Sequence, residues 1–239
     1  DVSLDFEKGS NYFIGRNGHG KSNLLEAIYA LSIGKSYRTS KGINLVNKDS
    51  GSYSSYLKGI AHYNNSASDL MLNIEVDEET KRVSKTYSFN SSSVSSIDFI
   101  GKLNVVLFEA KDLSIISGSP IARRRFLDIH ISQQDFSYLK ALQRYNKVLQ
   151  SRNKVLKDIK IGKSSKLELE FWTEKIIEDG LIISKRRKEK LYKITDETLK
   201  IFPNFIFGNE NLDINFVPSY NDLDNLNNDS LKTIFSENI

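Results

Sequence analysis

The chain has 239 residues, enough for one large domain or two modest ones, and its 39% hydrophobic content permits a packed core. It contains no cysteine, which excludes disulfides and thiolate metal sites, and no apolar run is long enough for a membrane span. The net charge of +4 is unevenly spread, because residues 118–200 carry 20 basic and 11 acidic side chains. This basic segment favours a polyanionic partner, and a solvated helical surface is the alternative interpretation.

The first third of the chain predicts short strands, a glycine loop and a helix. Residues 2–6 and 12–14 have strand-like apolar patterns and are separated by a Glu-Lys-Gly turn. After the glycine loop, apolar spacing predicts a helix from Lys21 to a stop at Gly34, with Glu26 on its surface.

Strand-like runs follow at residues 54–63, 69–76, 82–89 and 103–108. Residues 77–81 read as a hairpin turn and the serine-rich stretch 88–96 as a loop. Three antiparallel strands with one wet face are the simplest interpretation.

The second half of the chain predicts a helical hairpin. Ser119 is a candidate N-cap with Pro120 at the first helical position. Apolar residues recur at three- to four-residue steps from Phe136 to Leu156, and again from about Leu167 to Leu199, with residues 158–165 between the two tracts. Alternation at residues 212–216 then returns to strand texture.

The stretch "GRNGHGKSNLL" is the most informative motif. Gly15, Gly20, Lys21 and Ser22 satisfy the pattern Gly-x4-Gly-Lys-Ser/Thr, in which backbone N–H groups curl around phosphate oxygens. Lys21 would neutralise the β- and γ-phosphates of ATP, and Ser22 would offer its hydroxyl to Mg²⁺. The predicted nucleotide-binding residues are Gly15, Arg16, Asn17, Gly18, His19, Gly20, Lys21, Ser22 and Asn23.

Hydrolysis needs an acidic residue at the end of a buried strand, and the sequence offers no complete catalytic set. The tempting candidate is the acidic run at residues 77–79, but the strand before it alternates apolar and polar residues. A central parallel strand would be apolar on both faces, so we assign this run to the hairpin turn.

Three stretches resemble the RecF family, bacterial recombination and repair proteins of the SMC-like branch of ABC-type ATPases. They are "GRNGHGKSNLLEAIYALSIGKSYRTSK", "NVVLFEAKDLSIISGSPIARRRFLDIHISQ" and "YLKALQRYNKVLQSRNKVLK". Ala110 and Lys111 stand where this family usually has Pro-Glu, which replaces an acidic position near the nucleotide, and Gly42 stands where it often has Asp. Both ends look cut, since the family's usual first strand, signature segment and Asp-rich strand are not found.

The resemblance implies an α+β or α/β fold: a P-loop ABC-type ATPase head, with a mixed sheet and an antiparallel β lobe, interrupted by a helical-hairpin arm. Residues 1–117 would form the N-terminal lobe of the head, residues 118–205 the arm, and residues 206–239 the start of the return to the head. Catalysis would be at most a weak DNA-dependent ATPase activity of a longer protein, and we expect negligible turnover from this chain alone.

The resemblance also implies a cytoplasmic DNA-repair and replication protein. It would dimerise in response to ATP, bind double-stranded, gapped or damaged DNA, and help a RecR-type mediator load the recombinase. A small-molecule P-loop kinase and a non-catalytic DNA- or partner-docking fragment are the alternatives.

Several basic residues outside the loop are candidates for contacts with these ligands. Arg38 would contact a phosphate or a base, unless it is an ordinary exposed loop arginine. The candidate DNA contacts are Arg123, Arg124, Lys185, Arg186 and Arg187, although such clusters are often solvated helix faces. Of Arg123–Arg125, at most two can face one phosphate track, because each helical step rotates the side chain by about 100°.

Overall fold

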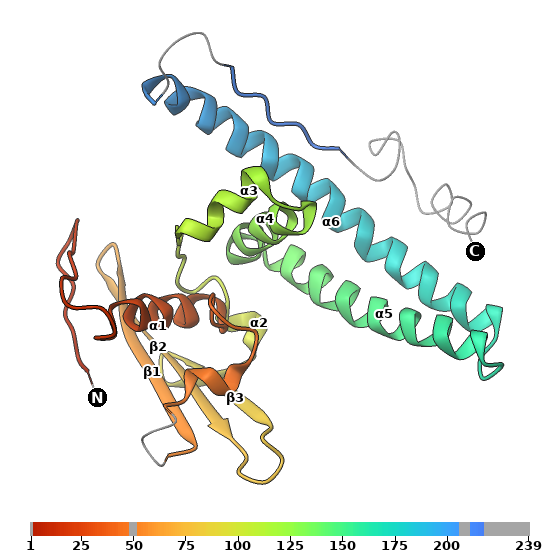
Figure 1. The fold of residues 1–239 in the computed structure, drawn as a ribbon, viewed down its shortest axis with the longest axis horizontal. Helices are drawn as coiled ribbons and strands as arrows, with labels where there is room; N and C mark the ends of the chain where they lie inside the picture. Colours follow the sequence, from red (N-terminus) through yellow and green to blue (C-terminus); the bar gives the residue numbers. More distant parts are fainter. Residues whose placement is uncertain (1, 48–51, 206–210, 218–239) are drawn as a thin grey trace. The chain divides into compact units, whose positions relative to one another are not determined.

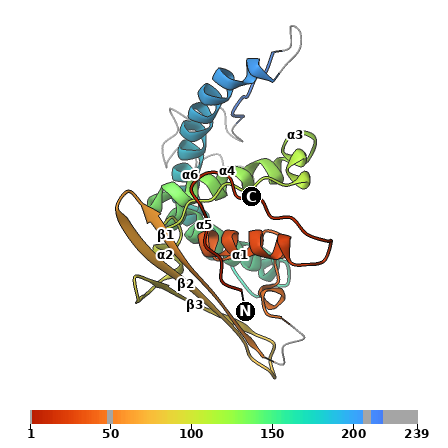
Figure 2. The same ribbon diagram turned by 90° about the vertical axis from the view of Figure 1, so that its left-hand side faces the viewer.

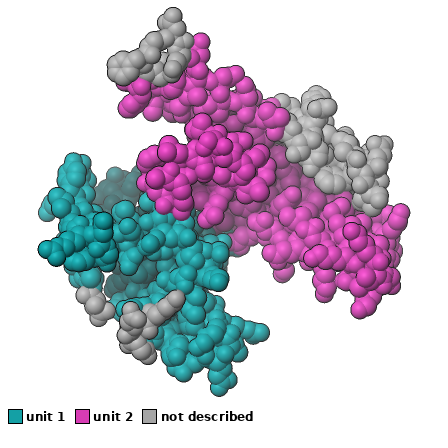
Figure 3. Space-filling model, in the orientation of Figure 1, with its two compact units in different colours: residues 1–107 teal, residues 108–239 magenta. Residues whose placement is uncertain are grey.

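The computed structural model describes residues 2–47, 52–205 and 211–217, which form parts of two compact units, residues 1–107 and 108–239 (Figure 3). The helices and strands of the first unit are α1 (Lys21–Ile33), the 3₁₀ turn η1 (Gly42–Leu45), β1 (Ser54–Tyr63), β2 (Ser66–Val76), β3 (Val83–Phe89), β4 (Ser92–Val94) and α2 (Ser96–Phe99). Those of the second unit are η3 (Ala110–Leu113), α3 (Ser114–Ser117), α4 (Pro120–Gln134), α5 (Phe136–Lys160), α6 (Lys166–Ile201) and η4 (Phe202–Asn204).

The first unit is built on an antiparallel sheet with strand order β1-β2-β3-β4. Leu72, at the centre of β2, lies opposite Leu57 on one side and Tyr87 on the other. Every second residue of β2 from Leu70 to Val76 is buried, and α1 covers this face (Figures 1 and 2). The predicted α+β class and the sheet with one wet face are therefore confirmed.

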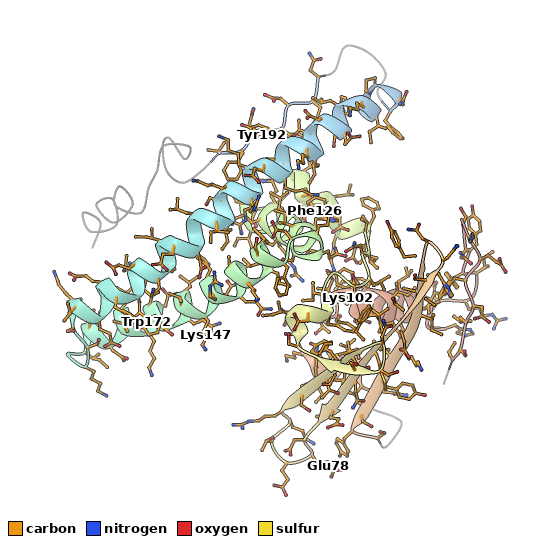
Figure 4. All side chains as sticks on the ribbon, turned by 180° about the vertical axis from the view of Figure 1, so that it is seen from behind. Glu78, Lys102, Phe126, Lys147, Trp172 and Tyr192 are labelled. Atoms are coloured by element: carbon orange, nitrogen blue, oxygen red, sulfur yellow. The ribbon has the colours of Figure 1, made fainter. Side chains whose placement is uncertain are left out.

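The hairpin between β2 and β3 ends in a tight turn at residues 77–81. Asp77 accepts hydrogen bonds from the N–H and hydroxyl of Thr80, both at 2.6 Å. These two bonds, the hydroxyl first, lower the pKa of the exposed Asp77 carboxyl. Glu78 marks the tip of the hairpin (Figure 4), so the acidic run belongs to a turn, as the alternation predicted.

Gly34 ends α1 in a left-handed conformation, with φ of 72°. Its carbonyl accepts a 2.7 Å hydrogen bond from Lys85 Nζ, and burial lowers the pKa of this ammonium group. A Cβ at Gly34 would lie 3.0 Å from the Tyr87 ring. The stop predicted here thus depends both on the backbone conformation and on close contact with β3.

Gly34→Ala should destabilise the first unit by more than left-handed strain alone, which costs about 1 kcal/mol. Crowding against Tyr87 should add roughly 1–3 kcal/mol. Native-state hydrogen exchange of the β2 amides would measure the total. Gly162→Ala is the matched control, because Gly162 has φ of 71° and an added Cβ would meet nothing within 4 Å. Hydrogen exchange of the α5 amides would measure the stability lost in this control. Equal losses in the two variants would contradict the crowding.

Four segments differ from their sequence-based assignments. Residues 2–6, 12–14, 103–108 and 212–216 form no strand, although their apolar alternation predicted one. A strand is defined by backbone pairing, and none of the described strands pairs with these segments. The turn between the first two does form, since the Asn11 side chain bonds the N–H and carbonyl of Glu7.

The serine-rich stretch 88–96 is not the loop that its composition predicted. Asn90 and Ser91 have φ of 49° and 62° and make a two-residue turn from β3 into β4. Ser95 then caps α2 by accepting from the N–H of Asp98. The polar composition of this stretch predicted a loop, but it is also compatible with a hairpin. Primed hairpin turns need positive φ, which Asn tolerates.

In the second unit, α5 and α6 form the predicted helical hairpin (Figure 1). Asp135 caps α5 through the N–H of Tyr138 at 3.0 Å, and Ser165 caps α6 through the N–H of Glu168. Two apolar clusters hold the unit together. One joins α4, α5 and α6 around Leu127, Ile131, Tyr138, Ala141 and Ile183, and the other joins α5 and α6 around Ile176 and Ile177.

A polar network lies beside the first of these clusters. Arg187 on α6 donates two hydrogen bonds to Asp128 on α4, at 2.9 and 3.0 Å, and Tyr138 on α5 donates to the same carboxylate at 2.5 Å. Burial raises the pKa of the Tyr138 hydroxyl. Burial alone would lower the pKa of Arg187, but Tyr138 and Asp128 outweigh it and raise this pKa. One carboxylate therefore ties three helices together.

No helix among the residues that the structure describes combines the length and the apolar character needed to cross a membrane.

Candidate functional site

The glycine loop leads directly into α1 and bends at two glycines. Gly18 and Gly20 have φ of 84° and 86°, a region that side-chain-bearing residues rarely adopt. A Cβ on either glycine would meet nothing within 4 Å, so the loop is open on this side and conformation, not crowding, requires glycine. The N–H of His19 points back to the carbonyl of Arg16 at 3.4 Å, which closes the turn.

Lys21 folds back over the loop. Its ammonium group donates to the carbonyl oxygens of Gly15 at 2.6 Å and Arg16 at 2.7 Å. One positive charge is thereby fixed next to the backbone amides of the bend. This contact brings together both ends of the Gly-x4-Gly-Lys motif.

The first turn of α1 supplies further donors. The N–H groups of Lys21, Ser22 and Asn23 have no carbonyl four residues earlier within the helix, and no side chain caps the helix at Gly20. The partial positive charge of the helix start adds to that of Lys21. Ser22 is exposed, with its hydroxyl on the first turn, where a phosphate-bound Mg²⁺ could be held. The arrangement offers backbone amides, an ammonium group and a hydroxyl, which are groups suited to a polyphosphate.

Glu26 anchors a second segment beside this site. The sequence placed it on the helix surface, but its side chain is buried and accepts a hydrogen bond from Ser36 Oγ. Ser36 Oγ in turn accepts from the N–H groups of Arg38 at 2.9 Å and Thr39 at 3.0 Å. The connector after α1 is therefore tied back to the helix. No local pattern indicates this contact, because the partner of Glu26 lies outside the helical repeat.

Arg38 reaches the start of α1 from this connector. Its Nη1 donates to Asn23 Oδ1 at 2.9 Å and lies 3.4 Å from Glu26 Oε2. About half of its side chain is exposed, at 49%. The guanidinium group thus bonds the residue next to Ser22 and is held by a buried carboxylate, so Arg38 is not a free loop arginine. Its contact with a phosphate or a base stays a prediction.

The predicted DNA-contact residues lie in the second unit and differ in their surroundings. Arg123 donates to the carbonyl of Gly118 at 3.0 Å and to those of α3. Arg186 pairs with Asp135 and Glu189, and Arg187 is enclosed with Asp128. Arg124 and Lys185 are exposed. Asp128 on α4 thus pairs with Arg187 on α6.

The segment that carries Lys111 forms η3. Lys111 makes an ion pair with Glu109, and Asp112 closes a capping box by accepting from the N–H of Glu109 at 2.8 Å. The lysine that replaces the family's acidic residue is thus neutralised by a carboxylate two residues earlier.

A glycine bend, a lysine folded over it and an uncapped helix start define a phosphate-loop domain. The chain belongs to the AAA domain family, whose model matches residues 1–230. It is 35% identical over 236 residues to the DNA replication and repair protein RecF of Clostridium kluyveri, a match that covers 98% of this chain and 62% of that protein. RecF of Leptospira interrogans is 36% identical over 225 residues, covering 94% and 60%.

Solved structures agree with this assignment. The recombination mediator protein RecF-ATPrS in the RecFOR pathway superposes with a TM-score of 0.86 at 31% identity, covering 98% of this chain and 62% of that one. RecF-ATP in the same pathway gives a TM-score of 0.80 at 30% identity. The resemblance to RecF and the ATPase-head fold predicted from sequence are confirmed. The chain spans about three fifths of the length of these relatives.

Proposed function

We propose that the glycine loop binds ATP together with Mg²⁺. The observation that carries this proposal is the position of the Lys21 ammonium group, held against Gly15 and Arg16 beside the uncapped amides of α1. Gly15–Gly20 would surround the phosphates, Ser22 would ligate Mg²⁺, and Asn23 and Arg38 would border the γ-phosphate side. The solved relatives named RecF-ATP and RecF-ATPrS support the choice of ATP.

In the whole protein, ATP binding would control association with DNA during recombinational repair and replication. The support is similarity to RecF proteins and a second unit rich in basic residues. The proposed partners are double-stranded or gapped DNA, a second copy of the protein joined through ATP, and a RecR-type mediator that helps load the recombinase. Slow ATP hydrolysis in the cytoplasm belongs to the same proposal, and Arg124 and Lys185 are its exposed candidates for phosphate contacts.

Equilibrium titrations test both parts. A fluorescent ATP analogue should bind the chain in the presence of Mg²⁺ and be displaced by ATP, and the whole protein should bind duplex DNA more tightly with ATP than without. Steady-state turnover by the chain alone should stay near background. No binding of ATP would refute the site, and turnover that depends on a small-molecule acceptor would indicate a kinase instead.

A further inference from the structure

Helix α5 differs from the rest of the second unit in its charge balance. Between Phe136 and Lys160 it carries seven basic residues and one acidic residue, Asp158. The basic residues are Lys140, Arg144, Lys147, Arg152, Lys154, Lys157 and Lys160. The DNA contacts predicted from sequence lie on α4 and α6 instead, because the charges of α5 are spread out rather than clustered.

The helical geometry places three of these lysines in a row. Lys140, Lys147 and Lys154 are each seven residues apart, so successive members are rotated by only about 20° and separated by about 10 Å along the axis. All three are exposed, and Lys147 can be followed on α5 in Figure 4. The other side of α5 packs on its neighbours through Tyr138 and Ala141. We call Lys140, Lys147 and Lys154 the α5 row.

The α5 row has no carboxylate partner among the described residues. Lys140 lies over the Phe136 ring at 4.4 Å, and no ion pair is formed by Lys147 or Lys154 in the part of the chain that the structure describes. Two lysines of α6 differ from the row in this respect. Lys175 pairs with Glu178 at 3.4 Å and Lys200 with Glu197 at 2.6 Å, each three residues away.

This contrast separates a binding surface from an ordinary solvated helix. An exposed helix gains stability from carboxylates three or four residues from its lysines, and like charges at that spacing cost stability. Such pairs are present on α6. Around Lys147 the corresponding positions hold Gln143, Arg144, Gln150 and Ser151. Lys154 has Asp158 four residues later, but among the described residues the two form no ion pair, so no ion pair neutralises the row. The glutamine side chains beside the row are neutral hydrogen-bond donors, and the oxygens of a phosphodiester backbone could accept from them.

We infer that the α5 row is a phosphate-contacting surface for duplex DNA. It spans about 21 Å of helix axis, comparable to roughly six base pairs of B-DNA, so each lysine can meet a different phosphate. Contacts of this kind are independent of base sequence and position the protein on the duplex. This inference rests on the DNA-binding part of the proposed function and names the surface responsible.

The test is the salt dependence of duplex binding by the whole protein with ATP. The variant Lys147→Gln/Lys154→Gln should make the negative slope of log K against log salt shallower by about two, since each lost phosphate contact removes roughly 0.9 from its magnitude. The loss should be the same for unrelated duplex sequences. The control Lys175→Gln/Lys200→Gln removes the same charge from α6, where both lysines are already paired, and should keep the wild-type slope.

The outcomes separate the inference from the function on which it rests. If wild type binds DNA and the α5 variant keeps its slope, the α5 row is not the contact surface, while the proposed function stands. Equal losses in the α5 variant and the control would also overturn the inference, because they would report net charge only. If wild type binds no DNA, both proposals are wrong. Circular dichroism of the variants should show unchanged helix content, since glutamine is a good helix former.

Discussion

Replacing Lys21 with alanine is expected to weaken ATP binding about 10- to 100-fold, the range for losing hydrogen bonds to a charged group. The side chain is the one ammonium group that the motif places over the loop, where it bonds Gly15 and Arg16. Without it, the phosphates would keep only the backbone amides and the helix start. Displacement of a fluorescent ATP analogue measures the loss, and in the whole protein ATP should no longer strengthen DNA binding.

Lys35→Ala is the matched control for this experiment. It removes the same charge two residues after α1 ends at Ile33, at the opposite end of the helix from the loop. ATP affinity in this variant should stay near wild type. Should Lys21→Ala retain the full response of DNA binding to ATP, the mechanism proposed for the glycine loop would be wrong.

Arg187→Ala is expected to lower the free energy of unfolding of the second unit by about 3 kcal/mol. The substitution leaves Asp128 without the guanidinium group that bonds it at 2.9 and 3.0 Å. These side chains are only 17% and 21% exposed, and removing one partner of a largely buried pair leaves an uncompensated charge. Urea unfolding followed by the fluorescence of Trp172 measures the loss, because this is the single tryptophan of the chain and lies on α6 (Figure 4).

Arg186→Ala provides the comparison, since Arg186 is adjacent in sequence and 47% exposed, with its partners on the surface. Its removal should change the unfolding midpoint little. The double variant Asp128→Ala/Arg187→Ala should lose less stability than the two single variants added together, because the charges depend on each other. Strict additivity, or similar losses at Arg186 and Arg187, would contradict the buried network.

Local spacing was enough to predict the glycine loop, α1, the β1–β3 hairpins and the α5–α6 hairpin. Each depends on periodicity or turn chemistry within about 20 residues, which is what a single sequence displays. The segments at residues 2–14 and 103–108 show the limit of such local patterns. Alternating apolar residues indicate an extended chain, but whether it joins a sheet depends on a pairing partner that the local pattern does not specify.

The side chains around the site show the same limit. Glu26 is polar and sits within a helix, so exposure was the natural expectation, yet Ser36 and Arg38 enclose it from the following connector. Arg186 and Arg187 look identical in sequence, but only Arg187 meets Asp128, which lies 59 residues earlier. Long-range pairing decides which charges are structural and which can meet a ligand, and only the structure reveals it.

Helix α6 is supported at two separate places along its length. Ile176 and Ile177 are held by one apolar cluster, and Ile183, Leu191 and Ile194 by the other. The supports from Ile176 to Ile194 extend over about 27 Å of helix. Because α-helical hydrogen bonds resist stretching and sharp bending, we expect α6 to keep its shape between these two places. We therefore expect a displacement at one end of α6 to reach the other end mainly as a rotation of the whole helix.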